Sequence, residues 1–156
     1  MSTVVTWQTS STNSEDTEKL AEKLGACLKG GEVIELVSDL GGGKTTFVRG
    51  LARGAGSKDR VASPTFTISR VYEAGNKEIH HFDFYRLGEA GLIGEELSEV
   101  LGDPTIITVV EWADIVQDVL PAQRLTITIA KTPTDGRELT FRAPLALDYL
   151  IKALQK

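Results

Sequence analysis

The sequence predicts an α/β domain, and two observations carry that prediction. Helix and strand signals alternate along the chain, and a glycine-rich stretch, SDLGGGKTT at residues 38–46, joins a short apolar run to a helical one. The chain has 156 residues, of which 41% are hydrophobic and 25% are charged, so it has enough apolar side chains for a full core. We therefore expect residues 1–156 to form a single domain.

The N-terminal part predicts a strand followed by a helix. Residues 3–9 are rich in β-branched side chains, which favour a strand. Residues 11–29 carry apolar side chains at helical spacing, and Thr12 with Glu15 matches a capping box at the start of that helix. The paired glycines at residues 30–31 are expected to end it.

The glycine-rich stretch is expected to lie between a strand and a helix. The apolar run 32–37 predicts a short strand directly before it, and residues 45–54 predict a helix directly after it. The apolar side chains that would face inward from this second helix are Phe47, Val48, Leu51 and Ala55.

The rest of the chain predicts two antiparallel hairpins, one central strand and three further helices. The hairpin strands flank the turn sequences AGN and PTDG, and they comprise residues 65–74 with 77–87 and residues 124–130 with 137–143. Residues 105–112, TIITVVEW, form a nearly continuous β-branched run that is typical of a strand buried on both faces. The helices are expected at residues 94–102, 113–120 and 145–156.

Charge and cysteine content exclude several classes of function. The formal net charge is −5 and the pI is about 5.1, which argues against extensive direct contact with nucleic acid, because such contact needs a basic surface. The single cysteine, Cys27, cannot form an internal disulfide or a cysteine-rich zinc site. No apolar run resembles a signal peptide or is long enough to span a bilayer, so we expect a cytoplasmic protein without a membrane partner.

The glycine-rich stretch nearly matches the phosphate-binding pattern G-x-x-x-x-G-K-[ST]. Gly43, Lys44 and Thr45 occupy its last three positions. Three consecutive glycines allow the backbone N–H groups to curl closely around phosphates, and the following helix points its positive end at them. Lys44 would place its charge on the outer phosphates and Thr45 would offer a hydroxyl to Mg²⁺, so the phosphates of a nucleotide and Mg²⁺ are the expected ligands. We expect Lys44 to face solvent when no ligand is bound.

Ser38 stands where the pattern has its first glycine. A serine is tolerated there if its φ is negative, whereas a positive φ would strain the loop, and Ser38→Gly would then raise thermal stability. The alternative to a phosphate-binding loop is a plain glycine-rich turn between a strand and a helix.

Two acidic residues at strand ends are candidates for the metal or for its bound water. Asp83 lies in HHFDFY, and Glu111 ends the apolar run TIITVVEW, which would deliver it to the edge of the sheet beside the loop. The alternative for either is an ordinary strand-end carboxylate in solvent, and the pattern favours function more strongly for Glu111. His80 and His81 are adjacent, so in a strand they point to opposite faces and cannot share one metal.

Four segments together resemble the TsaE family, the bacterial ATPase of the pathway that makes threonylcarbamoyladenosine at position 37 of tRNA. The segments are DLGGGKTTFVRGL at residues 39–51, SPTFT at 63–67, HFDFYRL at 81–87 and EW at 111–112. The resemblance spans residues 14–137. It implies a P-loop NTPase-like domain of three layers, with a mixed, partly parallel sheet flanked by antiparallel hairpins. It also implies slow Mg²⁺-dependent ATP hydrolysis coupled to the TsaB and TsaD proteins, with tRNA reached only indirectly.

The resemblance also implies roles for individual residues. Lys44, Asp83 and Glu111 would be catalytic, and Thr45 with Glu111 would hold Mg²⁺. The residues that it implies in nucleotide binding are Ser14, Asp39, Leu40, Gly41, Gly42, Gly43, Lys44, Thr45, Thr46, Thr65 and Arg137.

The chain departs from the family pattern at three places. The family usually has glycine where Ser38 stands, alanine where Gly42 stands, and D-P-E-E-L where this chain has GEAGLIGEEL at residues 88–97.

Two other functions stay open at this point. One is a small P-loop kinase acting on a metabolite, although such enzymes generally carry a substrate-binding insertion and an arginine-bearing lid. The other is a nucleotide-binding module that does not need hydrolysis.

Overall fold

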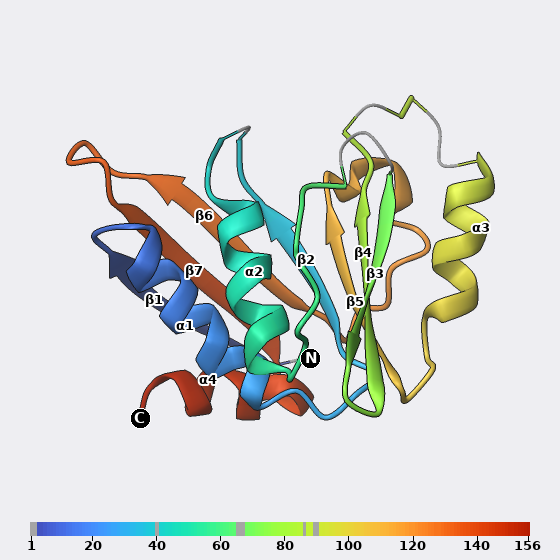
Figure 1. Ribbon diagram of the computed structural model, residues 1–156, viewed down its shortest axis with the longest axis horizontal. Helices are drawn as coiled ribbons and strands as arrows, with labels where there is room; N and C mark the ends of the chain where they lie inside the picture. Colours follow the sequence, from blue (N-terminus) through green and yellow to red (C-terminus); the bar gives the residue numbers. More distant parts are fainter. Residues whose placement is uncertain (1–2, 40, 65–67, 86, 89–90) are drawn as a thin grey trace.

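The computed structural model describes residues 3–39, 41–64, 68–85, 87–88 and 91–156 (Figure 1). Within these residues seven strands form one mixed sheet in the order β1-β7-β6-β2-β5-β4-β3. The strands are β1 (Val4–Ser11), β2 (Val33–Val37), β3 (Ser69–Ala74), β4 (Lys77–Asp83), β5 (Ile106–Glu111), β6 (Leu125–Lys131) and β7 (Arg137–Pro144). The helices are α1 (Ser14–Ala26), α2 (Lys44–Gly54), α3 (Gly91–Val100) and α4 (Asp148–Leu154), with the short 3₁₀ turns η1 (Ala113–Val116) and η2 (Leu145–Leu147).

Strand pairing confirms the predicted mixture of parallel and antiparallel strands. β2 is parallel to β5 and to β6, and β4 is parallel to β5. The two predicted hairpins are β3–β4 and β6–β7, both antiparallel, and β1 adds to β7 in the antiparallel sense. Parallel strands bring their carboxyl ends to one edge of the sheet, and in this fold that edge holds the candidate residues Asp83 and Glu111.

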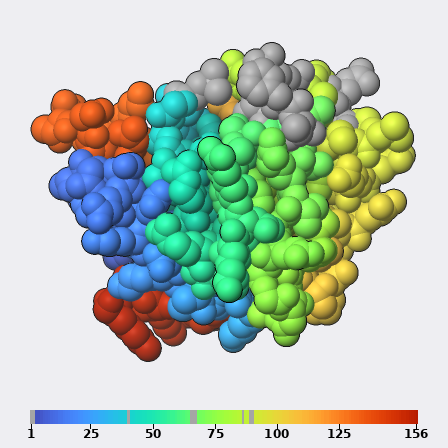
Figure 2. All heavy atoms as spheres, in the orientation of Figure 1, coloured from blue at the N-terminus to red at the C-terminus, as the bar shows by residue number. Residues whose placement is uncertain are grey.

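Two hydrophobic cores lie on opposite faces of the sheet, which confirms the three layers. One core joins the sheet to α1, α2 and α4, and it includes Leu24, Leu51 and Ile151. Figure 2 shows α1 and α2 side by side on this face. The other core lies beneath α3 and η1, and it includes Leu97 and Val116. β5 lies between the two cores with all of its residues buried, as its β-branched run predicts.

The start of α1 differs from the predicted capping box. Asn13 is the N-cap, and its side-chain oxygen accepts a hydrogen bond from the Asp16 backbone N–H at 2.8 Å. The Asp16 carboxylate in turn accepts from the Thr12 backbone N–H at 3.2 Å. Capping therefore occurs one residue later than predicted, with Asn13 and Asp16 in place of Thr12 and Glu15, although the Asp16 carboxylate accepts from the Thr12 N–H and not from that of the cap residue.

Other element boundaries also shift. α1 ends at Ala26, before the glycines that the sequence marks as its end. Those glycines, Gly30 and Gly31, have φ values of 111° and 85° and instead shape the turn into β2. α3 begins at Gly91 rather than at residue 94, the helix expected at 113–120 is reduced to η1, and the C-terminal helix divides into η2 and α4. None of the helices in the described part of the chain is long and apolar enough to cross a membrane.

The buried carboxylate of Glu32 links α4 to the turn before β2 through hydrogen bonds. Glu32 is buried, and it accepts hydrogen bonds from the backbone N–H groups of Lys29 and Gly30, both at 2.7 Å. The Tyr149 hydroxyl of α4 donates to the same carboxylate at 2.6 Å, and the Lys29 ammonium lies 4.2 Å from the Tyr149 ring centroid. Burial, together with the hydrogen bond to Glu32, raises the pKa of the Tyr149 hydroxyl, which therefore stays protonated and donating.

We expect Tyr149→Phe to lower the free energy of unfolding by about 1.5–3 kcal/mol, the range for a hydrogen bond to a charged group. Urea unfolding followed by circular dichroism measures this value. Tyr85→Phe is the matched control, because Tyr85 is 42% exposed and its hydroxyl makes no hydrogen bond to another of the described residues. Equal stability of Tyr149→Phe and the unchanged protein would show that the contact contributes nothing.

Candidate functional site

The glycine-rich loop leaves the carboxyl end of β2 and enters α2 at Lys44. Gly41 and Gly43 have φ values of 74° and 105°, a backbone region that favours glycine. Gly43 is the N-cap of α2, and no side chain of the described residues caps this end of the helix. The first N–H groups of α2 therefore point out of the helix without a side-chain acceptor from that part of the chain, which is the arrangement that binds anions in proteins.

A cavity of about 270 Å³ lies at this end of α2. It brings together the loop, the start of α2 and the ends of β4 and β5. Its lining residues are Gly41, Gly42, Gly43, Lys44, Thr45, Thr46, Ser63, Asp83, Glu111 and Trp112. Most of the residues that the sequence singles out thus surround one space, whereas Leu40 and Thr65 lie outside the described residues.

The two predicted carboxylates are neighbours on adjacent strands. Asp83 of β4 pairs in register with Glu111 of β5, at the carboxyl edge of the sheet. Both side chains are buried, and Glu111 is only 2% exposed. Asp83 accepts a hydrogen bond from the Tyr85 backbone N–H at 2.9 Å. Two buried carboxylates so close together favour a cation in the cavity, because like charges in a poorly solvated site repel each other.

Lys44 is not solvent-facing, and the expectation made from the sequence is wrong on this point. Its side chain is buried, with 7% exposed, and its ammonium donates to the backbone carbonyls of Ser38 at 2.9 Å and Asp39 at 3.3 Å. The ammonium also lies 4.5 Å from the Trp112 ring centroid. Burial lowers the pKa of Lys44, and the negative charges of Glu111, Asp83 and Asp39 oppose that shift. The Lys44 ammonium is thus held by two backbone carbonyls of the glycine-rich loop.

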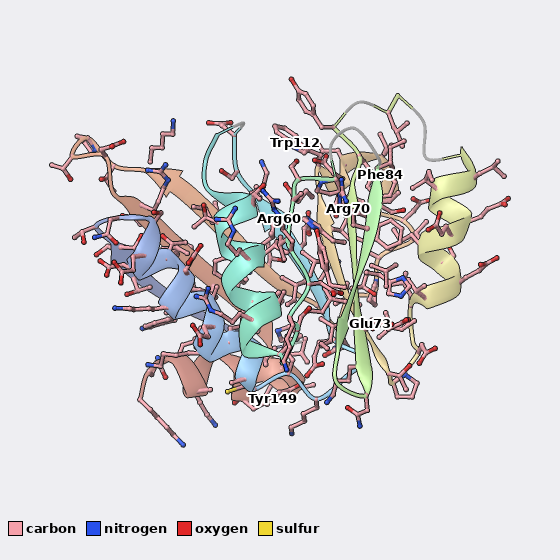
Figure 3. The ribbon with its side chains drawn as sticks, in the orientation of Figure 1. Arg60, Arg70, Glu73, Phe84, Trp112 and Tyr149 are labelled. Carbon is pink, nitrogen blue, oxygen red and sulfur yellow. The ribbon has the colours of Figure 1, made fainter. Side chains whose placement is uncertain are left out.

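Trp112 covers Lys44 because of an unusual backbone conformation. Its φ of 54° and ψ of 53° lie in the left-handed region, which a tryptophan rarely adopts. The ring packs against Tyr85, with the ring centroids 4.9 Å apart. Figure 3 places Trp112 at the loop end of the sheet. The indole N–H is buried and has no hydrogen-bond acceptor among the described residues.

A second cavity, of about 280 Å³, adjoins the first and shares Gly43 and Thr46 with it. It is lined by the start of α1 and the β6–β7 turn, and Ser14 and Arg137 both belong to it. The Arg137 guanidinium donates to the Gly42 carbonyl at 2.9 Å and to the Gly136 carbonyl at 2.9 Å. Arg137 therefore ties the β6–β7 turn to the glycine-rich loop.

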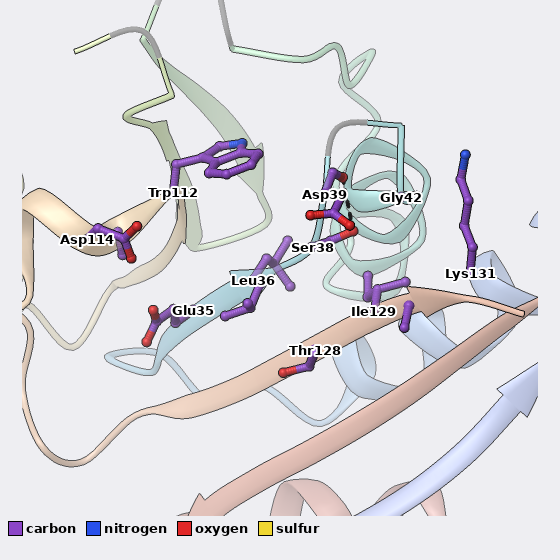
Figure 4. Close-up of a pocket in the computed structure, with 13 residues that line it drawn as sticks. Glu35, Leu36, Ser38, Asp39, Gly42, Trp112, Asp114, Thr128, Ile129 and Lys131 are labelled. Atoms are coloured by element: carbon purple, nitrogen blue, oxygen red, sulfur yellow. Dashed lines mark hydrogen bonds between the residues drawn. The ribbon is translucent and has the colours of Figure 1, made fainter. Parts of the chain in front are cut away.

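A third and larger cavity, of about 600 Å³, lies on the other side of the loop (Figure 4). Strands β2 and β6 form its floor, and Trp112 and Asp114 lie at its side (Figure 4). Asp39 lines this cavity and not the one that holds Lys44. Neither Asp83 nor Glu111 contributes to it. Of the candidate site residues that the structure describes, all except Asp39 line one or both of the two smaller cavities.

Ser38 is compatible with the loop. The described non-glycine residues with positive φ are Ile68, Trp112 and Asp135, so Ser38 is not in the conformation that would strain it. Its hydroxyl donates to the Asp39 carbonyl at 3.1 Å. A β-carbon built on Gly42 would lie 1.7 Å from the Ser38 hydroxyl oxygen and 2.9 Å from the Asp39 carbonyl oxygen. The side chain of Ser38 therefore occupies the space that a side chain at position 42 would need.

We expect Ser38 and Gly42 to be energetically coupled. Gly42→Ala alone should lower the free energy of unfolding by about 1–3 kcal/mol, the usual cost of overpacking. Ser38→Gly alone should have a small effect, and the double variant should recover at least half of the loss caused by Gly42→Ala. Urea unfolding of all four chains gives the coupling energy directly. Strictly additive effects would contradict the steric link between the two positions.

His81 is a site residue that reasoning from the sequence did not identify. The two histidines do point to opposite faces of β4, as predicted: His80 approaches Glu78 at 3.1 Å, whereas His81 is fully buried. His81 Nε2 lies in hydrogen-bond contact with Glu111 Oε2. The feature of the sequence that could have identified His81 is its i, i+2 spacing from Asp83, because this spacing puts both side chains on one face of the strand. No cluster of three metal-binding side chains occurs among the described residues.

Known proteins resemble this chain over most of its length. The sequence model of the family described as "Threonylcarbamoyl adenosine biosynthesis protein TsaE" matches residues 11–139. The tRNA threonylcarbamoyladenosine biosynthesis protein TsaE of Bacillus subtilis is 40% identical over 142 residues, which cover 88% of this chain and 84% of that protein. The protein of the same description from Treponema pallidum is 34% identical, over 83% of this chain and 96% of that protein. The crystal structure of Bacillus subtilis YdiB aligns with a TM-score of 0.78 and 35% identity, over 99% of this chain and 96% of that chain.

Proposed function

The chain belongs to the TsaE family of tRNA threonylcarbamoyladenosine biosynthesis, and from this premise we propose that it is a Mg²⁺-dependent ATP-binding protein with weak ATPase activity. We further propose that it acts in the cytoplasm and supports modification of adenosine 37 in tRNA through a complex of TsaB and TsaD.

One observation carries this proposal: Lys44, Thr45, Asp83 and Glu111 surround a single cavity at the uncapped N-terminus of α2. Backbone N–H groups and an ammonium provide donors for phosphate oxygens. A hydroxyl and carboxylates are the hard oxygen ligands that Mg²⁺ prefers, so the donor set fits this ion. A plain structural turn would need neither the buried lysine nor the paired buried carboxylates.

Each residue then has a defined part in the proposed reaction. Thr45 and Glu111 would hold Mg²⁺, which neutralises phosphate charge when it is bound. Lys44 would leave the carbonyls of Ser38 and Asp39 and bind the outer phosphates, because a phosphate oxygen is a stronger partner than a neutral carbonyl. Asp83, held by the Tyr85 N–H, would order the attacking water and accept its proton.

The adjoining cavity would take the nucleoside. It shares Gly43 and Thr46 with the phosphate cavity, so one ligand can extend through both. Ser14 and Arg137, which both line this cavity, would contact the base and ribose. Arg137 would also keep the loop in place through its hydrogen bond to the Gly42 carbonyl.

The proposal is tested by the rate of ATP hydrolysis with and without TsaB and TsaD from the same organism. We expect a slow Mg²⁺-dependent rate from the protein alone and a clear increase when both partners are present. TsaB alone and TsaD alone serve as controls. An unchanged rate with the complete pair would contradict coupling to that complex. Transfer of labelled phosphate to a metabolite without partners would favour a kinase instead.

A further inference from the structure

His81 and Glu111 form a buried pair directly beneath the proposed phosphate cavity. In the register of β4 and β5, His81 pairs with Val109 and Asp83 pairs with Glu111. His81 therefore lies two residues before Asp83, on the same face of the sheet as both carboxylates. His81 is fully buried and Glu111 is 2% exposed. Contact between His81 Nε2 and Glu111 Oε2 therefore occurs without competing water.

The geometry specifies which ring nitrogen carries the proton. His81 Nδ1 is buried and has no hydrogen-bond partner among the described residues. A buried N–H without an acceptor costs more than an unprotonated ring nitrogen without a donor. The Nε2–H tautomer satisfies the one available contact, so Nε2–H donates to Glu111 Oε2.

The hydrogen bond occupies only one oxygen of Glu111. Within the described part of the chain, the side-chain hydrogen bonds of this residue involve Oε2 and not Oε1. Glu111 also lines the cavity that contains Lys44 and Thr45. A glutamate has three rotatable side-chain bonds, and anchoring one carboxylate oxygen restricts all of them.

We infer that His81 is a positioning residue for Glu111, fixing the carboxylate so that Oε1 serves the bound Mg²⁺ or its water. This inference rests on the proposed ATPase function. His81 itself contacts neither nucleotide nor metal, and it acts by holding Glu111. Partners that orient a ligand side chain in this way typically change activity by about 10–100-fold when they are removed.

The first test needs no nucleotide. The chain contains two histidines, so ¹⁵N-histidine labelling yields two ring systems, which His80→Gln assigns. We expect His81 to be the Nε2–H tautomer with a strongly downfield Nε2 proton, and we expect that proton signal to disappear in Glu111→Ala. A His81 ring protonated at Nδ1 alone, or an unchanged His81 signal in Glu111→Ala, would overturn the inference.

The second test separates positioning from a purely structural role. His81→Leu removes the donor, whereas His81→Gln can place an amide N–H near the position of Nε2. With TsaB and TsaD present, we expect His81→Leu to lower kcat about 10–100-fold with less than a threefold change in the Kd of Mg·ATP, and His81→Gln to recover most of the loss. His80→Leu is the matched control on the other face of β4.

A double-mutant cycle completes the design. In a Glu111→Ala background, His81→Leu should cause no further loss of kcat, because the group that His81 holds is gone. Equal loss in His81→Leu and His81→Gln, or full additivity with Glu111→Ala, would overturn the inference.

The experiments distinguish failure of the proposed function from failure of the positioning role. An unaltered chain without ATPase activity refutes the proposed function, and the tautomer measurement still decides the His81–Glu111 contact. An active chain insensitive to His81→Leu refutes the positioning role alone.

Discussion

Lys44→Ala is expected to weaken the binding of Mg·ATP by about 100-fold or more, equivalent to about 3 kcal/mol. Lys44 lines the proposed phosphate cavity, and its ammonium donates to the carbonyls of Ser38 and Asp39. Because those contacts can be exchanged for phosphate oxygens, the lysine is available to the ligand although it is buried. Isothermal titration calorimetry measures the Kd.

The fold should survive this substitution. Ser38 and Asp39 are at least partly exposed residues, so we expect water to replace the donor that Lys44→Ala removes and the stability to change by no more than about 1 kcal/mol. Lys58→Ala, at an exposed lysine beyond α2, is the matched control for the loss of one positive charge. An affinity for Mg·ATP within threefold of the unaltered value would reject Lys44 as a phosphate ligand.

Glu111→Gln should leave ATP bound but lower its hydrolysis about 10²–10³-fold, the range for removing one group that stabilises transition-state charge, because a neutral amide holds Mg²⁺ less well than a carboxylate. The amide has nearly the same size as the carboxylate and can still accept a hydrogen bond from His81, so packing at the end of β5 should persist. Comparing kcat with the Kd of Mg·ATP distinguishes a catalytic loss from a binding loss.

The same variant tests whether hydrolysis is needed for tRNA modification. Glu99→Gln, on the exposed side of α3, is the control for the change in charge. If cells carrying Glu111→Gln lose threonylcarbamoyladenosine while the protein still binds ATP, then hydrolysis is required. If the modification persists without hydrolysis, the protein acts as a nucleotide-binding module and the ATPase part of the proposal is wrong.

The scaffold is largely predictable because its elements have strong local patterns. β5 is predicted by an uninterrupted β-branched run, and the structure buries all of its residues. The first helix shows the limit of local rules. Thr12–Glu15 and Asn13–Asp16 both have the spacing of a capping box, and the sequence alone does not show which pair caps the helix. Helix and strand ends depend on such small energy differences.

The site is predictable only where its residues are consecutive in the chain. The loop can be identified from SDLGGGKTT because its proposed function depends on adjacent backbone groups. The pairing of Asp83 with Glu111 depends on the register between two strands, which a strand pattern does not fix. The resting position of Lys44 depends on Trp112, whose left-handed backbone no propensity predicts. The role of His81 cannot be predicted from the sequence because its partner, Glu111, lies 30 residues further along the chain.

The most direct test is a crystal structure of the protein with Mg²⁺ and a non-hydrolysable ATP analogue. We predict that the phosphates lie between the backbone N–H groups of residues 41–46 and the carboxylates of Asp83 and Glu111, with Lys44 moved from the Ser38 and Asp39 carbonyls onto a phosphate. The nucleoside should extend between Ser14 and Arg137. An analogue bound instead in the larger cavity over β2 and β6, with Lys44 still on its carbonyls, would contradict the proposed site.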